Sequence, residues 1–200
     1  MLLLADNPTA VDSLREEILC VLKQEGWRKS TFQNLRLVDS ALKEVQRMMP
    51  NDRITMRRFA LKDVHIRDEN LTIRKGQYIT VDATRTEDPT LHEHPEKFDI
   101  YRWIRMGETP EYEKKAQFVN TSSEHLIFGH GIHACPGRFF ASNTLKIALC
   151  HLLLKYDWEL APGTTTELPT FGTANVVDLT KAFRFKRREA EIDLESLDFD

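Results

Sequence analysis

The sequence has no long apolar run and few cysteines. Its 200 residues contain no stretch of about 18 apolar residues, the length that a membrane-spanning helix requires. Residues 1–5 are too few, and lack the basic charge, for a signal peptide. The three cysteines, Cys20, Cys135 and Cys150, are odd in number and show no disulfide spacing. This usage is typical of a protein in a reducing compartment.

Charge and motif content exclude further classes of protein. The net charge is only −3, which favours neither a nucleic-acid partner nor strong attraction to a membrane surface. The chain has no internal repeat, no glycine-rich phosphate loop and no Ser–His–Asp order. Gly129 and Gly131 alone are not a dinucleotide fingerprint, because they do not follow a strand in a βαβ unit. We therefore expect no nucleic-acid partner and no membrane span in this chain.

The residues that are present predict helices with a few short strands. Hydrophobic residues make up 41% and charged residues 30% of the chain, which is typical of one soluble domain with a core. Apolar residues at helical spacing predict three main helices, over 8–26, 35–49 and 138–156. Runs with a period of two predict strands at 54–61, 64–66, 71–73, 77–81, 157–160 and 182–186. The predicted fold class is mainly α with a small β-sheet (α+β).

The same patterns predict which faces of the helices are buried. For the helix over 35–49, the apolar stripe consists of Leu35, Val38, Leu42, Val45 and Met49. For the helix over 138–156, the expected buried face consists of Leu145, Ala148, Leu149, Leu152 and Leu153. The segments 27–33 and 106–117 are polar or charged, so we expect a connection and a loop there.

One cysteine lies in a glycine-rich turn directly before the third helix, within the segment 128–138. Gly129 and Gly131 permit positive φ and a close approach of the backbone to a large, flat group. Pro136 fixes the chain direction just after Cys135, and the following helix N-terminus carries partial positive charge. That charge lowers the pKa of a thiol and makes a thiolate a good metal ligand. The geometry suits a single axial sulfur ligand to haem iron.

Two other interpretations of this cysteine remain open. A lone cysteine is more often a small buried hydrophobic residue than a ligand. A zinc site is the second alternative, with candidate ligands His125, His130, His133 and Cys135. Zinc sites usually pair two cysteines at close spacing with two histidines, and no second pair exists here.

The cysteine segment resembles the haem-binding signature of the cytochromes P-450, which reads Phe-x-x-Gly, a basic residue, and then Cys-x-Gly. The positions that fill it are Phe128, Gly131, His133, Cys135 and Gly137, with Gly129 as an additional glycine and Arg138 following. By this resemblance Cys135 is the axial ligand of haem iron and Phe128, Gly129, His133 and Gly137 line the cofactor. The family usually has arginine, a partner of a haem propionate, where His133 stands. A histidine at this position resembles the fungal members of the family that act in secondary metabolism.

A second resemblance lies on the helix over 35–49, where Glu44 and Arg47 are three residues apart. Taken alone, such a pair is usually solvated and contributes under about 1 kcal/mol. Its position resembles the Glu-x-x-Arg helix of the same family. There the pair is buried and is joined by a later arginine, which corresponds to Arg102. Such a buried network is better explained by specifying one fold than by net stability, which is a hypothesis for this chain.

A third resemblance concerns the strands after that helix. Arg58, Asp63-Val64 and Lys75-Gly76 fit the pattern of the family's β-sheet. By that resemblance Arg58 reaches a haem propionate, and guanidinium groups do bind carboxylates through two parallel hydrogen bonds. The alternative is a surface arginine beside Arg57, because a misalignment of one residue exchanges the two.

The resemblance implies the C-terminal portion of a cytochrome P-450 fold, incomplete at its N-terminal side. Residues 1–188 would be the haem-binding part, and residues 189–200 an acidic, disordered tail. Members of the family usually lie on the cytosolic face of the endoplasmic reticulum, held by an anchor. We see no anchor in this chain, which suggests a fragment that would be cytoplasmic if expressed as given.

The resemblance also implies a function, that of a haem-thiolate monooxygenase. Its cofactor would be haem b, and its electrons would come from NADPH through a reductase that docks on the proximal face. Its substrate would be a small lipophilic molecule, plausibly in fungal secondary metabolism. The alternative is a truncated, catalytically inactive remnant that at most binds haem or a partner.

Overall fold

The structure, a computed structural model, describes residues 1–197. Its α-helices are α1 (Leu2–Ala5), α2 (Pro8–Glu25), α3 (Lys29–Asn34), α4 (Arg36–Met48), α5 (Arg102–Gly107) and α6 (Arg138–Lys155). Two short 3₁₀ helices are η1 (Thr84–Glu87) and η2 (Gly131–His133). The strands are β1 (Ile54–Phe59), β2 (Val64–Ile66), β3 (Leu71–Ile73), β4 (Tyr78–Asp82), β5 (Tyr156–Leu160), β6 (Thr170–Phe171), β7 (Ala174–Asn175) and β8 (Phe183–Arg187). The predicted class, mainly α with a small β component, is confirmed.

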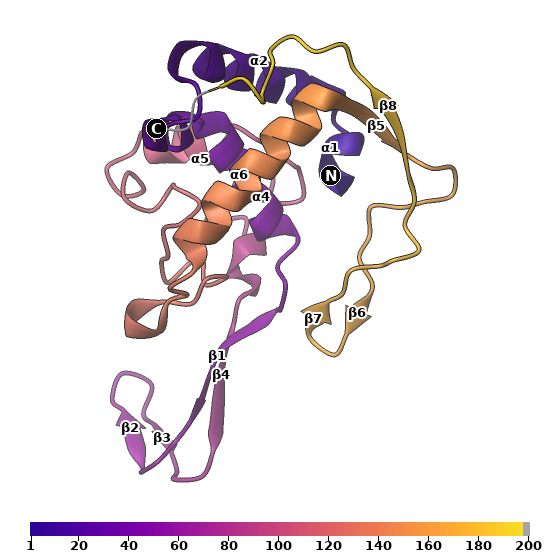
Figure 1. The fold of residues 1–200 in the computed structure, drawn as a ribbon. Coiled ribbons are helices and arrows are strands. Elements are labelled where there is room, and N and C mark those ends of the chain that lie inside the picture. The colour runs from indigo at the N-terminus through magenta and orange to yellow at the C-terminus, as the bar shows by residue number, and fades with distance from the viewer. Residues whose placement is uncertain (198–200) are drawn as a thin grey trace.

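The strands form four antiparallel pairs and no larger sheet within the described residues. Strand β1 pairs with β4, and β2 pairs with β3. These two pairs form an arm that extends away from the helices (Figure 1). Strands β5 and β8 pair along the other side of the helical body, and the short β6–β7 pair hangs below them. The ladder of β1 slips between Thr55 and Arg58, and Met56 adopts a positive φ of 51° there.

Helix α2 lies against α6 and contributes one side of the apolar core (Figure 1). Its fully buried side chains are Leu14, Ile18 and Leu22. They recur at helical spacing, as the sequence pattern predicts. Across from them, the core is completed by residues of α6 and of the segments around α3, among which Cys150, Leu153, Trp27 and Leu35 are buried.

Two charged side chains of α2 satisfy the ends of the neighbouring helices. Arg15 donates to the carbonyl oxygens of Leu153, at 2.8 Å, and Tyr156, at 3.0 Å, where α6 ends. The Glu17 carboxylate accepts hydrogen bonds from the amides of Leu37, at 2.6 Å, and Val38, at 2.9 Å, where α4 begins. Helix ends leave such groups without partners inside the helix, so α2 fixes the positions of α4 and α6.

The buried face of α4 is polar, which the sequence pattern did not predict. Leu35 and Val38 of the expected stripe are fully buried, whereas Leu42, Val45 and Met49 are only partly buried. In their place the helix buries four polar or charged residues, Ser40, Lys43, Glu44 and Arg47. The expectation for the C-terminal half of α4 is therefore wrong, because hydrogen bonds from other segments compensate these polar groups.

Glu44 is fully buried and accepts hydrogen bonds from four residues. Arg47 donates twice to its carboxylate, from Nη2 at 2.8 Å and from Nε at 2.9 Å. Arg102 Nε donates at 3.0 Å and Trp103 Nε1 at 3.2 Å. The amide of Asp99 completes the set at 3.4 Å. The structure therefore brings Glu44, Arg47 and Arg102 together in one buried network.

The two arginines of this network also hold irregular backbone. Arg47 donates to the carbonyl oxygens of Thr86, at 2.9 Å, and Pro95, at 2.7 Å. Arg102 donates to the carbonyl oxygen of Glu93 at 2.5 Å, and further to His94 and Lys97. Because buried carbonyl groups need partners, the path of the segment 84–97 depends on these guanidinium groups.

Two short helices were not expected from the sequence, and the buried face of α6 differs from the expected one. The segments expected as a polar connection and a charged loop include α3 and the end of α5, both short. On α6, Leu145 and Ala148 are exposed, and the buried residues are Ser142, Lys146, Cys150, Leu153 and Leu154. A buried ion pair between Lys146 and Asp39 explains why the polar side of α6 turns inward.

The segment 189–197 is packed against the core, so the expectation of a disordered tail is wrong for it. Leu194 is buried, and its carbonyl oxygen accepts a hydrogen bond from Trp27 Nε1 at 3.1 Å. Lys155 forms an ion pair with Glu195 at 3.1 Å. The remainder of the expected tail, 198–200, lies outside the described residues.

None of the helices described for residues 1–197 combines the length and the apolar character needed to cross a membrane.

We predict that Glu44→Gln lowers the free energy of unfolding by about 3–5 kcal/mol, because it leaves two buried arginines without their anion. The measurement is denaturant unfolding of the full chain. Glu159→Gln is the matched control, since Glu159 pairs with Arg184 at 3.5 Å on the surface. That change should cost less than about 1 kcal/mol. Equal losses in the two variants would contradict the structural role of Glu44.

Candidate functional site

The segment 128–138 folds into a tight loop that ends at the first turn of α6. The amide of Cys135 donates to the carbonyl oxygen of Phe128 at 2.7 Å, which closes the loop. Inside it, the amide of Ala134 donates to the carbonyl oxygen of Gly131 at 3.1 Å, around η2. Gly137 is the N-cap of α6. We call this segment the cysteine loop.

Two glycines allow this loop to form. Gly129 and Gly131 have φ values of 73° and 67°, in the left-handed region that disfavours side chains. A Cβ atom at Gly129 would lie 3.3 Å from the carbonyl oxygen of His133, so the two sides of the loop backbone approach each other closely there. A Cβ at Gly137 would lie 4.0 Å from Cys135 Sγ, which places the thiol beside the N-terminus of α6.

Arg138 fixes the loop to the segment that precedes it. Its Nη1 donates to the carbonyl oxygen of Cys135 at 2.7 Å, and its Nε donates to that of Val119 at 3.0 Å. The rings of Phe118 and Phe128 meet edge to face at 5.3 Å between centroids. Phe118 is buried and Phe128 is half-buried, so the aromatic pair seats the start of the loop.

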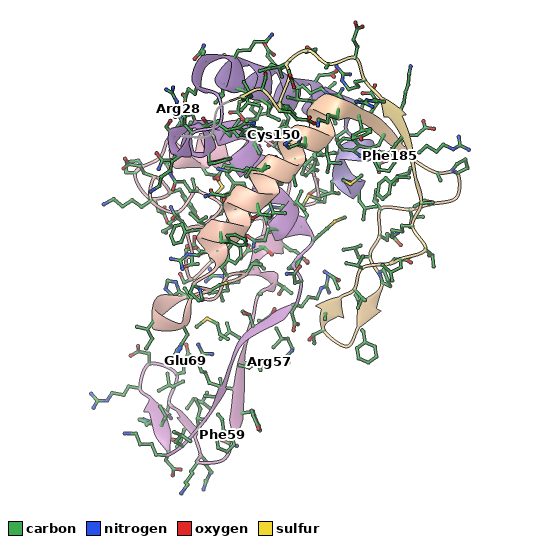
Figure 2. The ribbon with its side chains drawn as sticks, in the orientation of Figure 1. Arg28, Arg57, Phe59, Glu69, Cys150 and Phe185 are labelled. Atoms are coloured by element: carbon green, nitrogen blue, oxygen red, sulfur yellow. The ribbon has the colours of Figure 1, made fainter. Side chains whose placement is uncertain are left out.

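The three cysteines have different environments. Cys150 is fully buried on α6, and burial raises the pKa of its thiol to about 12 (Figure 2). Cys20 is exposed on α2. Cys135 is half-buried in the cysteine loop. A thiol whose pKa is raised this far is a poor metal ligand, so Cys150 serves as a core residue. Cys135, in contrast, is partly accessible and lies at the N-terminal end of a helix.

The histidines considered as zinc ligands do not gather around Cys135. His130 and His133 are exposed, whereas His125 is buried with its Nε2 2.9 Å from Gln46 Oε1. Within the described part of the chain, no group of three or more His, Cys, Asp or Glu side chains is placed to hold a metal ion. The zinc alternative has no support in the structure.

Arg58 lies on the arm and is exposed, with its Nη1 donating to the carbonyl oxygen of Arg57 at 2.8 Å. Figure 2 shows Arg57 on β1 where the arm leaves the body. Arg57 itself pairs with Asp52 at 2.7 Å. Among residues 1–197, no hydrogen bond or ion pair joins Arg58 to the cysteine loop.

Sequence reasoning missed a cluster of aromatic and basic groups beside the Glu44 network. The rings of His92 and His125 each meet the ring of Trp103 edge to face, at 5.4 Å between centroids. Burial lowers the pKa of His92 to about 4, and it holds the pKa of His125 well below its ordinary value, so both rings are neutral at pH 7. Lys43 lies over the ring of Trp103, with Nζ 4.7 Å from the centroid.

Comparison with known proteins gives a family for this arrangement. The sequence model of the family described as Cytochrome P-450 matches residues 1–187. The chain is 44% identical over 189 residues to the cytochrome P-450 monooxygenase hepE of Aspergillus oryzae, which covers 94% of this chain and 34% of that protein. It is 43% identical over 199 residues to the cytochrome P-450 monooxygenase eqxH of Fusarium heterosporum, covering 98% of this chain and 39% of that protein.

A solved structure shows the same fold. A cyanobacterial CYP120A1 with bound retinoic acid superposes with a TM-score of 0.72 and 23% identity, over 94% of this chain and 40% of that one. The chain thus spans 34% to 40% of the length of these proteins. The family match extends over nearly the whole sequence and agrees with the fold. This chain therefore belongs to the cytochrome P-450 family and forms part of its fold.

Proposed function

We propose that this chain carries the thiolate side of a haem site and belongs to a haem-thiolate monooxygenase. The observation that carries the proposal is the cysteine loop, in which the half-buried thiol of Cys135 lies at the N-terminus of an 18-residue helix. The partial positive charge of that helix end favours the negative charge of a thiolate. Thiolate is the axial ligand with which such enzymes bind haem.

The residues of the loop fit haem b as the cofactor. Cys135 would be the axial ligand, and Gly129 and Gly131, which carry no side chain and have positive φ, would leave room for a flat group beside the loop backbone. Phe128, half-buried against Phe118, would pack at the edge of the cofactor. His133 is exposed and free to approach a carboxylate. Gly137 leaves room beside Cys135 Sγ.

Arg58 is proposed as a partner of a haem propionate. Its guanidinium group uses one hydrogen bond within the arm, so it retains donors for a carboxylate. Its exposure on β1 is compatible with a role that only a bound cofactor completes.

Bound haem would supply the activation of dioxygen, and the protein would supply binding, orientation and electrostatics. Arg138 holds the Cys135 carbonyl, and the hydrogen bond to Phe128 holds the Cys135 amide, so the backbone that carries the sulfur has one defined position.

We propose that the enzyme oxygenates a small lipophilic substrate in fungal secondary metabolism. The fungal relatives named as monooxygenases support the oxygenation. We propose that electrons come from NADPH through a reductase that docks near the cysteine loop. We also propose that the enzyme acts at the cytosolic face of the endoplasmic reticulum, as is usual in the family.

The ligand assignment is tested by the absorption spectrum of the full chain with haem, reduced and exposed to carbon monoxide. We expect a strongly red-shifted Soret band, which reports thiolate ligation. Cys135→Ser should abolish that band, and Cys150→Ala should retain it, because Cys150 is a buried core thiol. A red-shifted band in Cys135→Ser would contradict the assignment. Thiolate binding without turnover by a reductase would instead favour the inactive remnant.

A second test uses alkylation, which requires an accessible thiolate. We expect iodoacetamide to modify Cys20 with or without haem, and to modify Cys135 at least about tenfold more slowly when haem is bound. Cys150 should react only after denaturation, since it is buried and its pKa is raised to about 12. Mass spectrometry of the peptides reads all three sites. Equal rates at Cys135 with and without haem would mean that haem binds elsewhere.

A further inference from the structure

Lys43 is a buried lysine whose partners are all backbone carbonyl groups. Its side chain is fully buried in α4, with 0% of its surface exposed. Nζ donates to the carbonyl oxygens of Lys115, at 2.6 Å, Gln117, at 2.8 Å, and Asn120, at 3.1 Å. An ammonium group has three N–H donors, and these three contacts use all of them.

The three carbonyl groups belong to one irregular segment, 115–120, which has no helix or strand. A second group of α4 holds the same segment, because the amide of Phe118 donates to Asp39 Oδ2 at 2.8 Å. The segment is thus fixed to α4 through both its carbonyl and its amide groups. No acidic side chain forms an ion pair with Lys43 among the described residues. When Lys43 is protonated, its charge is therefore stabilised by backbone dipoles, the ring of Trp103 and the more distant charge of Asp39.

The segment 115–120 in turn touches the cysteine loop at two points. The ring of Phe118 meets that of Phe128, the first residue of the loop, at 5.3 Å. The carbonyl oxygen of Val119 accepts from Arg138 Nε, and Arg138 Nη1 donates to the carbonyl oxygen of Cys135. A continuous set of contacts therefore connects Lys43 with the backbone that carries the thiol.

We propose that Lys43 is a positioning residue, which clamps the segment 115–120 and thereby sets the position of Cys135. The effect of Lys43 on haem ligation rests on the proposed function. The contacts of Lys43 with the segment 115–120, which we call the clamp, exist without the cofactor. Lys43 contacts neither Cys135 nor its loop directly, so it acts through Phe118 and Arg138.

The test is hydrogen exchange in the full chain without haem, comparing Lys43→Met with the native sequence. Methionine fills the space but donates nothing, so the carbonyl groups of Lys115, Gln117 and Asn120 lose this donor, and only that of Gln117 keeps another, the amide of Asn120. We expect the amides of Phe118 and Cys135 to exchange about tenfold faster or more, as loss of even one well-formed hydrogen bond implies. Unchanged protection of the Cys135 amide in a folded Lys43→Met variant would overturn the proposal.

Arg15→Met is the matched control. Arg15 is also a buried cation that donates to backbone carbonyl groups, but those of Leu153 and Tyr156 lie at the far end of α6 from Cys135. We expect it to lower overall stability and to leave the exchange of Phe118 and Cys135 close to native under conditions where the chain stays folded. An equal effect of both variants would show general destabilisation and overturn the specific role of Lys43.

A spectroscopic measurement distinguishes the proposed role of Lys43 from the proposed haem-thiolate function. With haem, reduced and exposed to carbon monoxide, Lys43→Met should show a smaller share of the red-shifted thiolate band than Arg15→Met at equal haem content. Equal shares would overturn the link to Cys135. If the native chain bound no haem, the proposed function would fail, whereas the exchange experiment would still decide the clamp.

A measurement on the native chain needs no substitution and remains decisive if Lys43→Met does not fold. Burial lowers the pKa of Lys43 from 10.5 to about 7, and the nearby charge of Asp39 opposes this shift. An opened clamp would hydrate Lys43 and restore its ordinary proton affinity. Between pH 7 and 10.5 the open state then binds a proton that the closed state lacks, so closing is favoured as pH rises, by up to about tenfold per pH unit.

We therefore expect protection of the Phe118 amide, corrected for the intrinsic pH dependence of exchange, to rise from pH 7 to pH 9. The other titratable groups near Lys43 do not account for such a rise. Burial keeps His125 neutral throughout this range, and Asp39 is held in its ion pair with Lys146 of α6. In the segment itself, Lys115 is partly exposed beside Glu124, at 3.9 Å. Protection independent of pH, with the lowered pKa of Lys43 confirmed by NMR titration of its side chain, would show that the segment opens without releasing Lys43, which overturns the proposal.

Discussion

The buried carboxylate of Glu44 is the constraint on which the rest of this structure depends. It is fully buried on α4, and donors from Arg47, Arg102, Trp103 and the amide of Asp99 converge on it. A buried ion pair of this kind contributes little net stability compared with apolar packing, but removal of one member leaves an uncompensated charge. Our hypothesis is that the network specifies one fold more than it stabilises it, because few alternative arrangements satisfy all of these groups.

The same physical device recurs wherever irregular backbone must be held. Arg47 and Arg102 bind carbonyl groups of the segment 84–97, Arg15 binds those at the end of α6, and Lys43 binds those of the segment 115–120. Such segments lack the partners that a helix or sheet gives to its own carbonyl groups. Cations anchored on helices supply those partners. The position of the cysteine loop is therefore imposed from regular elements that lie outside it.

Sequence reasoning located the three main helices, the strands of the arm and the cysteine loop, because each has a local pattern. It did not foresee that α4 buries Lys43. A pattern of apolar residues assigns every lysine to the exposed face, and the carbonyl partners of Lys43 lie about 70 residues further along the chain. The polar residues Ser40, Lys43, Glu44 and Arg47 do recur at helical spacing, which was the available signal. Arg57 and Arg58 were not separable, since the register of β1 against β4 shifts between Thr55 and Arg58, which no local pattern reveals.

The cysteine loop shows why a short motif predicts where a site lies better than it predicts the contacts that hold the site in place. Nearly all hydrogen bonds that shape the loop are between backbone groups, so the sequence carries only the requirements that remain, two glycines with positive φ and the side chain of Arg138. Those requirements lie within a few residues and are visible together. Apart from the ring of Phe118, the support comes from the backbone of 115–120, which any residue type provides. The interactions that set the sulfur's position thus leave little trace in the motif that identifies it.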